Sequence, residues 1–151
     1  MPAYQISLID VDPIPTVVVR RRATVAELPQ VVPAACGTVW QFIRAKTVQA
    51  GRNVALYLSD HVDLEAGAEA LGPFAPEGEI IRSQLPGGRV AMTTHVGPYG
   101  QLGSAHRAVR EWCERHGQAL ATPNWEIYAH WQEAWNRDPS KIETQVYYLL
   151  R

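Results

Sequence analysis

The sequence has few cysteines, because Cys36 and Cys113 are the only two among its 151 residues. They form no C-x-x-C motif, so the sequence indicates neither a disulfide framework nor a zinc site built on cysteines. Both fall in segments with a helical pattern, and we expect them to be small core residues.

An excess of charge is also lacking, because 14 Lys and Arg oppose 15 Asp and Glu for a net charge of −1. This balance gives no electrostatic footprint for nucleic acid or an anionic membrane, and we expect no direct partner of either kind. The sequence has no run of eighteen apolar residues and no N-terminal apolar segment of a signal peptide. We therefore expect a cytoplasmic protein.

Motifs for metals and cofactors are missing as well. The histidines show no H-E-x-x-H or H-x-x-x-H spacing, and the chain has no Walker loop, no G-x-S-x-G and no dinucleotide fingerprint. The sequence thus indicates no cofactor and no metal ion.

Hydrophobic residues make up 46% of the chain and charged residues 19%, which is typical of one folded domain, here residues 1–151. Residue patterns predict helices at 28–47 and 97–116 and strands at 1–11, 16–25, 54–58, 62–68, 79–85, 89–95, 125–131 and 142–150. Pro33 and Gly37 predict an irregular or late start of the first helix. Pro86-Gly87-Gly88 predicts a hairpin between the strands at 79–85 and 89–95.

The two halves of the chain, about 1–72 and 73–151, repeat one another. Helix residues match at a spacing of 70, as Val39 matches Val109, and strand residues match at 71, as Tyr57 matches Tyr128. We interpret the pattern as a duplicated strand–strand–helix–strand–strand unit, which predicts an α+β fold.

The segment N-W-E-I-Y at 124–128 places a lone carboxylate, Glu126, in an aromatic strand. Because side chains alternate between the faces of a strand, Glu126 shares a face with Tyr128 and His130, whereas Trp125 and Trp131 belong to the other, core-like face.

The position that matches Glu126 in the first half is Ala55, so the duplication did not require the carboxylate. An exposed strand glutamate would need no explanation. A costly residue in only one half of a repeat is nevertheless a candidate for function.

A carboxylate among aromatic rings suits a flat, lipophilic, cationic small molecule. The repeat adds Tyr57 to the expected pocket wall, and the last strand adds one of two adjacent tyrosines, for which we choose Tyr147. Glu65 would have to reach the same space if two acids were to carry out acid–base chemistry. The residues expected to bind a ligand are Glu126, Tyr128, Tyr57, Tyr147 and His130.

The stretch T-H-V-G-P-Y-G-Q-L-G-S-A-H-R-A-V-R-E-W-C-E-R-H-G, the W-E-I-Y motif, a D-P pair and the C-terminal E-T-Q-V-Y-Y-L-L resemble the GyrI-like small-molecule-binding family. This family is the effector-binding domain of AraC-type and MerR-type multidrug regulators, and the resemblance covers nearly the whole chain. It implies a tandem pair of strand–helix–strand–strand units with pseudo-twofold symmetry, antiparallel sheets and one long helix per half. It also implies that Glu126 lies at the base of a promiscuous aromatic pocket that includes Tyr128.

The first hypothesis is a stand-alone protein that captures lipophilic aromatic or cationic compounds in a groove between the halves, since the double unit leaves no room for a helix-turn-helix. The second, from the resemblance to some stand-alone relatives, is a hydrolase of strained cyclopropane-bearing toxins in which Glu126 is catalytic. The third is an interaction protein similar to a gyrase inhibitor. Besides a small molecule, the partners that we consider are a regulator protein and a second copy of the chain in a homodimer.

Overall fold

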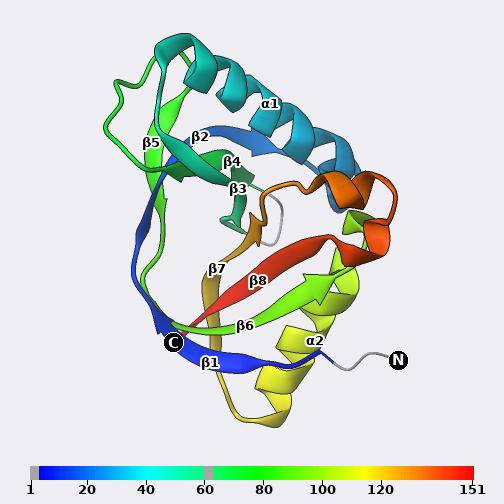
Figure 1. The fold of residues 1–151 in the computed structure, drawn as a ribbon. Helices are drawn as coiled ribbons and strands as arrows, with labels where there is room; N and C mark the ends of the chain where they lie inside the picture. The colour runs from blue at the N-terminus through cyan, green and yellow to red at the C-terminus, as the bar shows by residue number, and fades with distance from the viewer. Residues whose placement is uncertain (1–3, 60–62) are drawn as a thin grey trace.

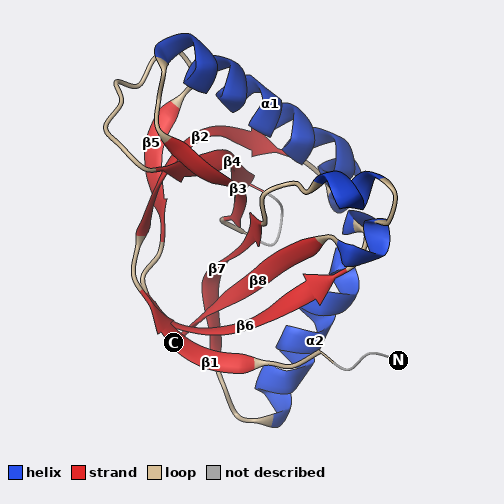
Figure 2. Ribbon diagram, viewed as in Figure 1, coloured by secondary structure: helices blue, strands red, loops and turns tan. Residues whose placement is uncertain are grey.

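The computed structural model describes residues 4–59 and 63–151. Residues 1–3 and 62 of the predicted strands lie outside this part of the chain. Within it, eight strands form one antiparallel sheet, and two α-helices lie along one side of that sheet (Figures 1 and 2). The α+β class predicted from the sequence is confirmed.

The strands are β1 (Ser7–Val11), β2 (Ile14–Arg22), β3 (Ala50–Tyr57), β4 (Asp63–Ala70), β5 (Ile81–Leu85), β6 (Gly88–Val96), β7 (Leu120–Tyr128) and β8 (Glu143–Leu150). The helices are α1 (Leu28–Lys46) and α2 (Leu102–Arg115). Neither helix in the described residues is both long and apolar enough to cross a membrane.

Helix α1 runs without a break through Pro33 and Gly37, so the predicted irregular start is wrong. Pro33 removes one backbone hydrogen bond near the N-terminal end of the helix, and Pro29 sits in the first turn, where no backbone donor is needed. Burial of the helix face that carries Val32, Val39 and Ile43 outweighs these local costs.

The strand order β1-β6-β8-β7-β3-β4-β2-β5 is the same from either end when each strand is replaced by its repeat equivalent. The middle of the sheet is the antiparallel pair β3–β7, where Ala55 is directly opposite Glu126. These two residues are each other's repeat equivalents. A pseudo-twofold axis therefore passes between Ala55 and Glu126.

The first strand of each half pairs with the second strand of the other half, because β1 pairs with β6 and β5 pairs with β2. The predicted hairpin between the strands at 79–85 and 89–95 is therefore wrong, although only Pro86 and Gly87 separate β5 from β6. Each of these strands buries its apolar side chains across the exchanged pairing instead, as Leu85 does against the other half.

Strands β5 and β6 lie toward opposite ends of the sheet, yet the chain that joins them can span only about 11 Å. The sheet must therefore curl until its two ends meet. A Cβ atom on Gly87 would lie 2.6 Å from Cδ of Pro13, which belongs to the equivalent β1–β2 connection. The two connections thus pack against each other and close one side of the curl.

The two faces of the sheet carry separate cores. Helix α1 packs on β2 and β4, and α2 packs on β6 and β8, all on the face that holds Ala55 and Glu126. The opposite face buries a third cluster, in which the Trp125 and Tyr147 rings stack at a centroid distance of 5.6 Å. The space above β3 and β7, between the two helices, remains for the site described below.

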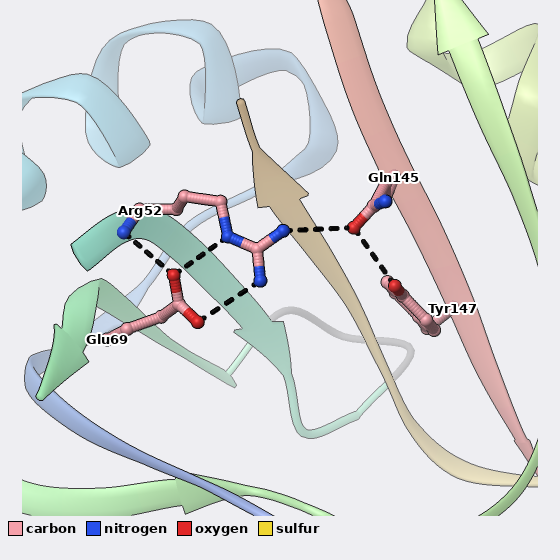
Figure 3. A network of polar contacts seen from close by, with 4 residues as sticks. All are labelled: Arg52, Glu69, Gln145 and Tyr147. Atoms are coloured by element: carbon pink, nitrogen blue, oxygen red, sulfur yellow. Dashed lines mark hydrogen bonds and ion pairs between the residues drawn. The ribbon is translucent and has the colours of Figure 1, made fainter. Parts of the chain in front are cut away.

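A polar network on the face opposite the helices joins the two halves (Figure 3). Arg52 on β3 forms a bidentate ion pair with Glu69 on β4, with Nε–Oε1 and Nη2–Oε2 distances of 2.8 and 3.2 Å. Its Nη1 donates to Oε1 of Gln145 on β8 at 3.3 Å, and the Tyr147 hydroxyl donates to the same oxygen at 3.0 Å. The network crosses β7 and so ties the first half to the second.

Replacing Glu69 with Gln tests this tie. Burial acts to raise the pKa of Glu69, but the hydrogen bonds and charge of Arg52 outweigh it, so the net pKa is lowered. A carboxyl group whose pKa is lower in the folded state stabilises that state at pH values above its unfolded-state pKa. This stability is lost as pH falls through the folded-state pKa. We expect Glu69→Gln to reduce the free energy of unfolding by about 1–3 kcal/mol at neutral pH, measured by urea unfolding.

The deficit should shrink as the pH of the urea series is lowered, because wild-type Glu69 is then protonated and loses the same interactions. Glu143→Gln, which changes an exposed glutamate on β8, serves as the control and should change little. A Glu69→Gln deficit of equal size at acidic and neutral pH would contradict the charge-based account.

Candidate functional site

Glu126 lies on the helix side of β7 and is only 4% exposed. The Tyr57 hydroxyl, from the first half, donates to Oε1 of Glu126 at 3.0 Å. The Tyr128 hydroxyl, from the second half, donates to the same oxygen. Because Tyr57 and Tyr128 are repeat equivalents, two symmetry-related hydroxyls converge on one carboxylate beside the pseudo-twofold axis.

The other carboxylate oxygen of Glu126, Oε2, lies 2.6 Å from Nε2 of His106 on α2. Nδ1 of His106 lies 2.8 Å from the Tyr148 hydroxyl, which also accepts a hydrogen bond from Arg110 at 2.9 Å. An imidazole with its proton on Nε2 would donate to Glu126 and let Nδ1 accept from Tyr148. A polar chain therefore leads from the floor of the site to the exposed Arg110 on α2.

The two tyrosines that contact Glu126 act as fixed hydrogen-bond donors. Burial raises the pKa of Tyr57, and the charge of Glu126 raises it further. The same two causes hold the pKa of Tyr128 well above its usual value. Both hydroxyls consequently keep their protons at physiological pH and stabilise the negative charge of the carboxylate.

A pocket of about 570 Å³ opens over Glu126, between α1, β3 and the end of β7. This volume is in the usual range for a small-molecule site. Val32, Trp40 and Leu102 contribute apolar walls, and Glu126 is the only acidic lining residue in the described part of the chain. Across residues 4–59 and 63–151, no group of three or more His, Cys, Asp or Glu could hold a metal ion.

The room in the pocket comes from small residues in the first half. Where the second half carries a larger side chain, the first half carries a smaller one at the matching position: Ala55 for Glu126, Cys36 for His106 and Gly37 for Arg107. Burial raises the pKa of Cys36 to about 11, so this residue stays a neutral thiol in the wall. The pocket therefore lies to the α1 side of the pseudo-twofold axis.

Aromatic rings that are partly exposed line the mouth of the pocket. Tyr99 and Trp131 are 42% and 52% exposed, with ring centroids 6.5 Å apart. The Tyr99 ring also meets the partly buried Tyr128 ring edge-on at a centroid distance of 5.7 Å, and the Trp135 ring packs edge-on against Trp131 at 5.5 Å. These rings offer a flat stacking surface that continues from the entrance to the carboxylate.

Four of the five expected ligand-binding residues share this pocket: Glu126, Tyr128, Tyr57 and His130. Strand β7 ends at Tyr128, so His130 reaches the pocket from the segment after the strand. Trp131 was expected on the core-like face and instead lines the pocket, because the alternation of a strand no longer applies there.

Tyr147 does not lie in this pocket. It is on the opposite face of the sheet, stacked on Trp125 and bonded to Gln145, whereas its neighbour Tyr148 faces the helices. Glu65 also lies away from the pocket, because its carboxylate is bonded to Arg20 at 3.1 Å on the opposite face. The site therefore contains one carboxylate rather than a pair.

Sequence reasoning missed His106 and Tyr99. A signal for His106 exists, since it is the polar residue in the stripe of α2 that also carries Leu102, Val109 and Cys113. Its repeat equivalent, Cys36, points to the same space. Tyr99 lies in the G-P-Y motif but outside any regular periodic pattern, so only the tertiary structure shows it beside Tyr128.

A duplicated antiparallel sheet with two helices, and between them an apolar pocket around one buried carboxylate, is the arrangement of a small-molecule-binding domain. The chain belongs to the GyrI-like family, since the sequence profile described as the GyrI-like small molecule binding domain matches residues 4–151. Comparison with curated proteins gave no match.

Solved structures of three proteins illustrate the shared fold. The EcmrR C-terminal domain is 22% identical, with 98% of each chain covered and a TM-score of 0.79. In the EcmrR–DNA complex the chain spans 58% of the regulator. SAV2435 bound to tetraphenylphosphonium is 10% identical, with 97% of the present chain and 94% of SAV2435 covered and a TM-score of 0.67. A hydrolase from Listeria innocua is 13% identical, with 100% of the present chain and 94% of the hydrolase covered and a TM-score of 0.62. At these low sequence identities, the structural similarity is evidence for the shared fold alone.

Filling the pocket from α1 tests its location. A Cβ atom on Gly37, which lines the pocket, would meet no atom within 4 Å, and the same holds for Gly103 on α2, which does not line it. Leu at either position should favour the helix by about 0.5–1 kcal/mol. Only Gly37→Leu should weaken binding of the neutral apolar dye Nile red, measured by fluorescence titration. Equal dye affinity in the two variants would place the dye elsewhere.

Proposed function

We propose that this domain binds lipophilic aromatic cations in the pocket between α1 and β7, and that Glu126 supplies the negative charge. The observation that carries the proposal is one carboxylate, 4% exposed, at the floor of an aromatic pocket. Taking a carboxylate out of water costs free energy that its hydrogen bonds offset only in part. A bound cation would offset more of this cost, so the site favours positively charged ligands.

Selection by charge at this site needs no hydrogen bond from the ligand. The oxygens of Glu126 already accept from Tyr57, Tyr128 and His106. At about 6 Å and an effective dielectric of about 20, two opposite unit charges attract by about 3 kcal/mol. Organic cations without N–H groups suit such a site, because their charge acts through space.

The aromatic mouth would bind the rest of the ligand. Stacking on Tyr99 and Trp131 tolerates many ring shapes, and cations are attracted to the faces of such rings. Arg44 also lines the pocket, and its guanidinium lies 5.9 Å from the centre of the Trp40 ring on α1. The tetraphenylphosphonium bound to SAV2435, a structure with the same fold, has the aromatic and cationic chemistry proposed here.

We further propose that the bound compound acts as an effector and that this domain makes no direct contact with DNA. The net charge of −1 offers no phosphate-binding surface. The similarity in fold to the effector domain of EcmrR supports this role.

Isothermal titration with tetraphenylphosphonium, and with the neutral triphenylphosphine oxide, tests the charge. Glu126→Gln keeps the size of the side chain but removes its charge and replaces one acceptor oxygen with an NH2 donor. We expect a loss of roughly 30–100-fold in affinity for the cation. The neutral compound should change by less than about threefold.

Glu65→Gln is the matched control, because Glu65 is as buried as Glu126 but lies on the opposite face of the sheet. It should leave the affinity for both compounds unchanged. Cation affinity that survives Glu126→Gln would refute the charge-based pocket.

A hydrolase is the second candidate, favoured by the oriented polar groups around Glu126. The carboxylate would take a proton from water as the water oxygen bonds to one carbon of a strained ring. The ring bond to that carbon breaks in the same step, and the carbon that receives its electron pair then takes the proton from Glu126, which restores the carboxylate. The product gains one water, and His106, Tyr57 and Tyr128 hold the carboxylate in place throughout.

This second function predicts turnover of a cyclopropane-bearing electrophile, followed as a mass gain of one water. Glu126→Gln should slow it by about 10²–10⁴-fold, the usual contribution of a general base. Glu65→Gln should leave the rate unchanged. Stoichiometric binding without any hydrated product would exclude hydrolysis of that compound and leave the binding function intact.

A further inference from the structure

Among the described side chains that hydrogen-bond Glu126, only His106 can become a cation. Histidine ordinarily changes its charge between pH 5 and 8. Tyr57 and Tyr128, the other two donors, are held as neutral hydroxyls over that range. The charge on the floor of the pocket is therefore set by Glu126 and His106 together.

The geometry around His106 can serve both of its charge states without movement. In the neutral state Nε2–H donates to Glu126 at 2.6 Å, and Nδ1 accepts from the Tyr148 hydroxyl at 2.8 Å. In the protonated state Nδ1–H donates to the Tyr148 oxygen instead, because a hydroxyl can either donate or accept. A proton can thus be gained or lost while the side chains stay in place.

The groups that face His106 come from every element packed around it. Glu126 comes from β7, Tyr148 from β8, and Tyr57 from β3, with a ring-centroid distance of 6.4 Å to the imidazole. Arg110, on α2 itself, donates to the Tyr148 hydroxyl that contacts His106. Of the acidic and basic side chains in this set, Glu126 contacts the imidazole directly.

We propose that a proton on His106 and a cationic ligand compete for the charge of Glu126, so that capture of the cation releases a proton. With His106 neutral, the Glu126–His106 pair carries one negative charge and attracts cations. With His106 protonated, the pair sums to zero and the pocket retains only its apolar and aromatic attraction. The pH therefore selects the charge of the ligand. This inference rests on the proposed binding function and adds its regulation.

The sign of the effect follows from linkage. A ligand that binds the deprotonated state of the Glu126–His106 pair more tightly gains affinity as pH rises. The expected gain for a cation is roughly 10–100-fold between pH 5 and 8, the size of one unit charge acting across the pocket. A neutral aromatic ligand should change little over the same range.

The two residues that take part in this competition, His106 and Glu126, both belong to the second half of the chain. The repeat equivalent of His106 is Cys36, a buried thiol that lines the pocket. This thiol stays neutral over the same range, since burial raises its pKa. His106 acts through Glu126 and is a positioning residue rather than a direct ligand contact.

Calorimetric titration of the full chain with tetraphenylphosphonium and triphenylphosphine oxide between pH 5 and 8 tests the competition. Buffers with different ionisation enthalpies report the protons released. Wild type should lose cation affinity as pH falls and should release up to one proton per cation. His106→Gln keeps a donor to Glu126 but cannot be protonated. It should bind the cation with little pH dependence and without proton release.

His116→Gln, at the exposed end of α2 and outside the pocket, is the matched control and should behave as wild type. If His106→Gln fails to fold, the imidazole NMR shifts of wild-type His106 give a second readout, and the cation should move them toward the neutral form. Tight cation binding that is independent of pH, or a pH dependence that persists in His106→Gln, would overturn this inference while leaving the proposed function in place. Absence of cation binding at every pH would instead overturn the proposed function, and this inference with it.

Discussion

The cross-strand pair of Ala55 and Glu126 determines the character of the pocket, because it is the position in the β3–β7 pair where a residue faces its own repeat equivalent. Two glutamates at this place would set like charges directly opposite each other, an arrangement that destabilises a sheet. The symmetry of the frame therefore allows one carboxylate and demands a small, neutral partner. The tyrosines at 57 and 128 are under no such constraint, because the axis separates them. They keep the symmetry and donate to the same oxygen.

The two helices also differ in what they contribute to the site. On the α2 side, His106 and Arg110 extend the polar contacts of Glu126 toward solvent. On the α1 side, Cys36 and Gly37 leave a cavity that the protein itself does not fill. A void beside buried side chains forfeits packing energy. The interhalf network around Arg52, on the far face, and the cores under the helices hold the frame despite this loss.

Periodicity and repeat spacing can be read directly from the sequence, so they predicted the ten principal helices and strands of the described residues, the repeat, and a shared pocket wall for Glu126, Tyr57 and Tyr128. Strand partners are not local, so the β5–β6 hairpin was wrong: a short connection limits distance but does not choose which edge a strand joins. Alternation along the strand places Tyr147 and Tyr148 on opposite faces of the sheet but does not say which of them faces the helices. The prediction that Tyr147 lines the pocket was therefore wrong. His106 was missed because a single polar residue in an apolar helical stripe carries no information about its partner on another element.

The exchange of first strands has a consequence for how such a chain can arise. In each half, the edge of the second strand is covered by a strand from the other half. A polypeptide with a single unit would leave this edge open, and an open edge invites pairing with a second copy. The present chain has the architecture of a strand-swapped homodimer fused into one polypeptide. Within one polypeptide the two halves can differ in sequence, so that one supplies the acidic floor of the pocket and the other its empty space.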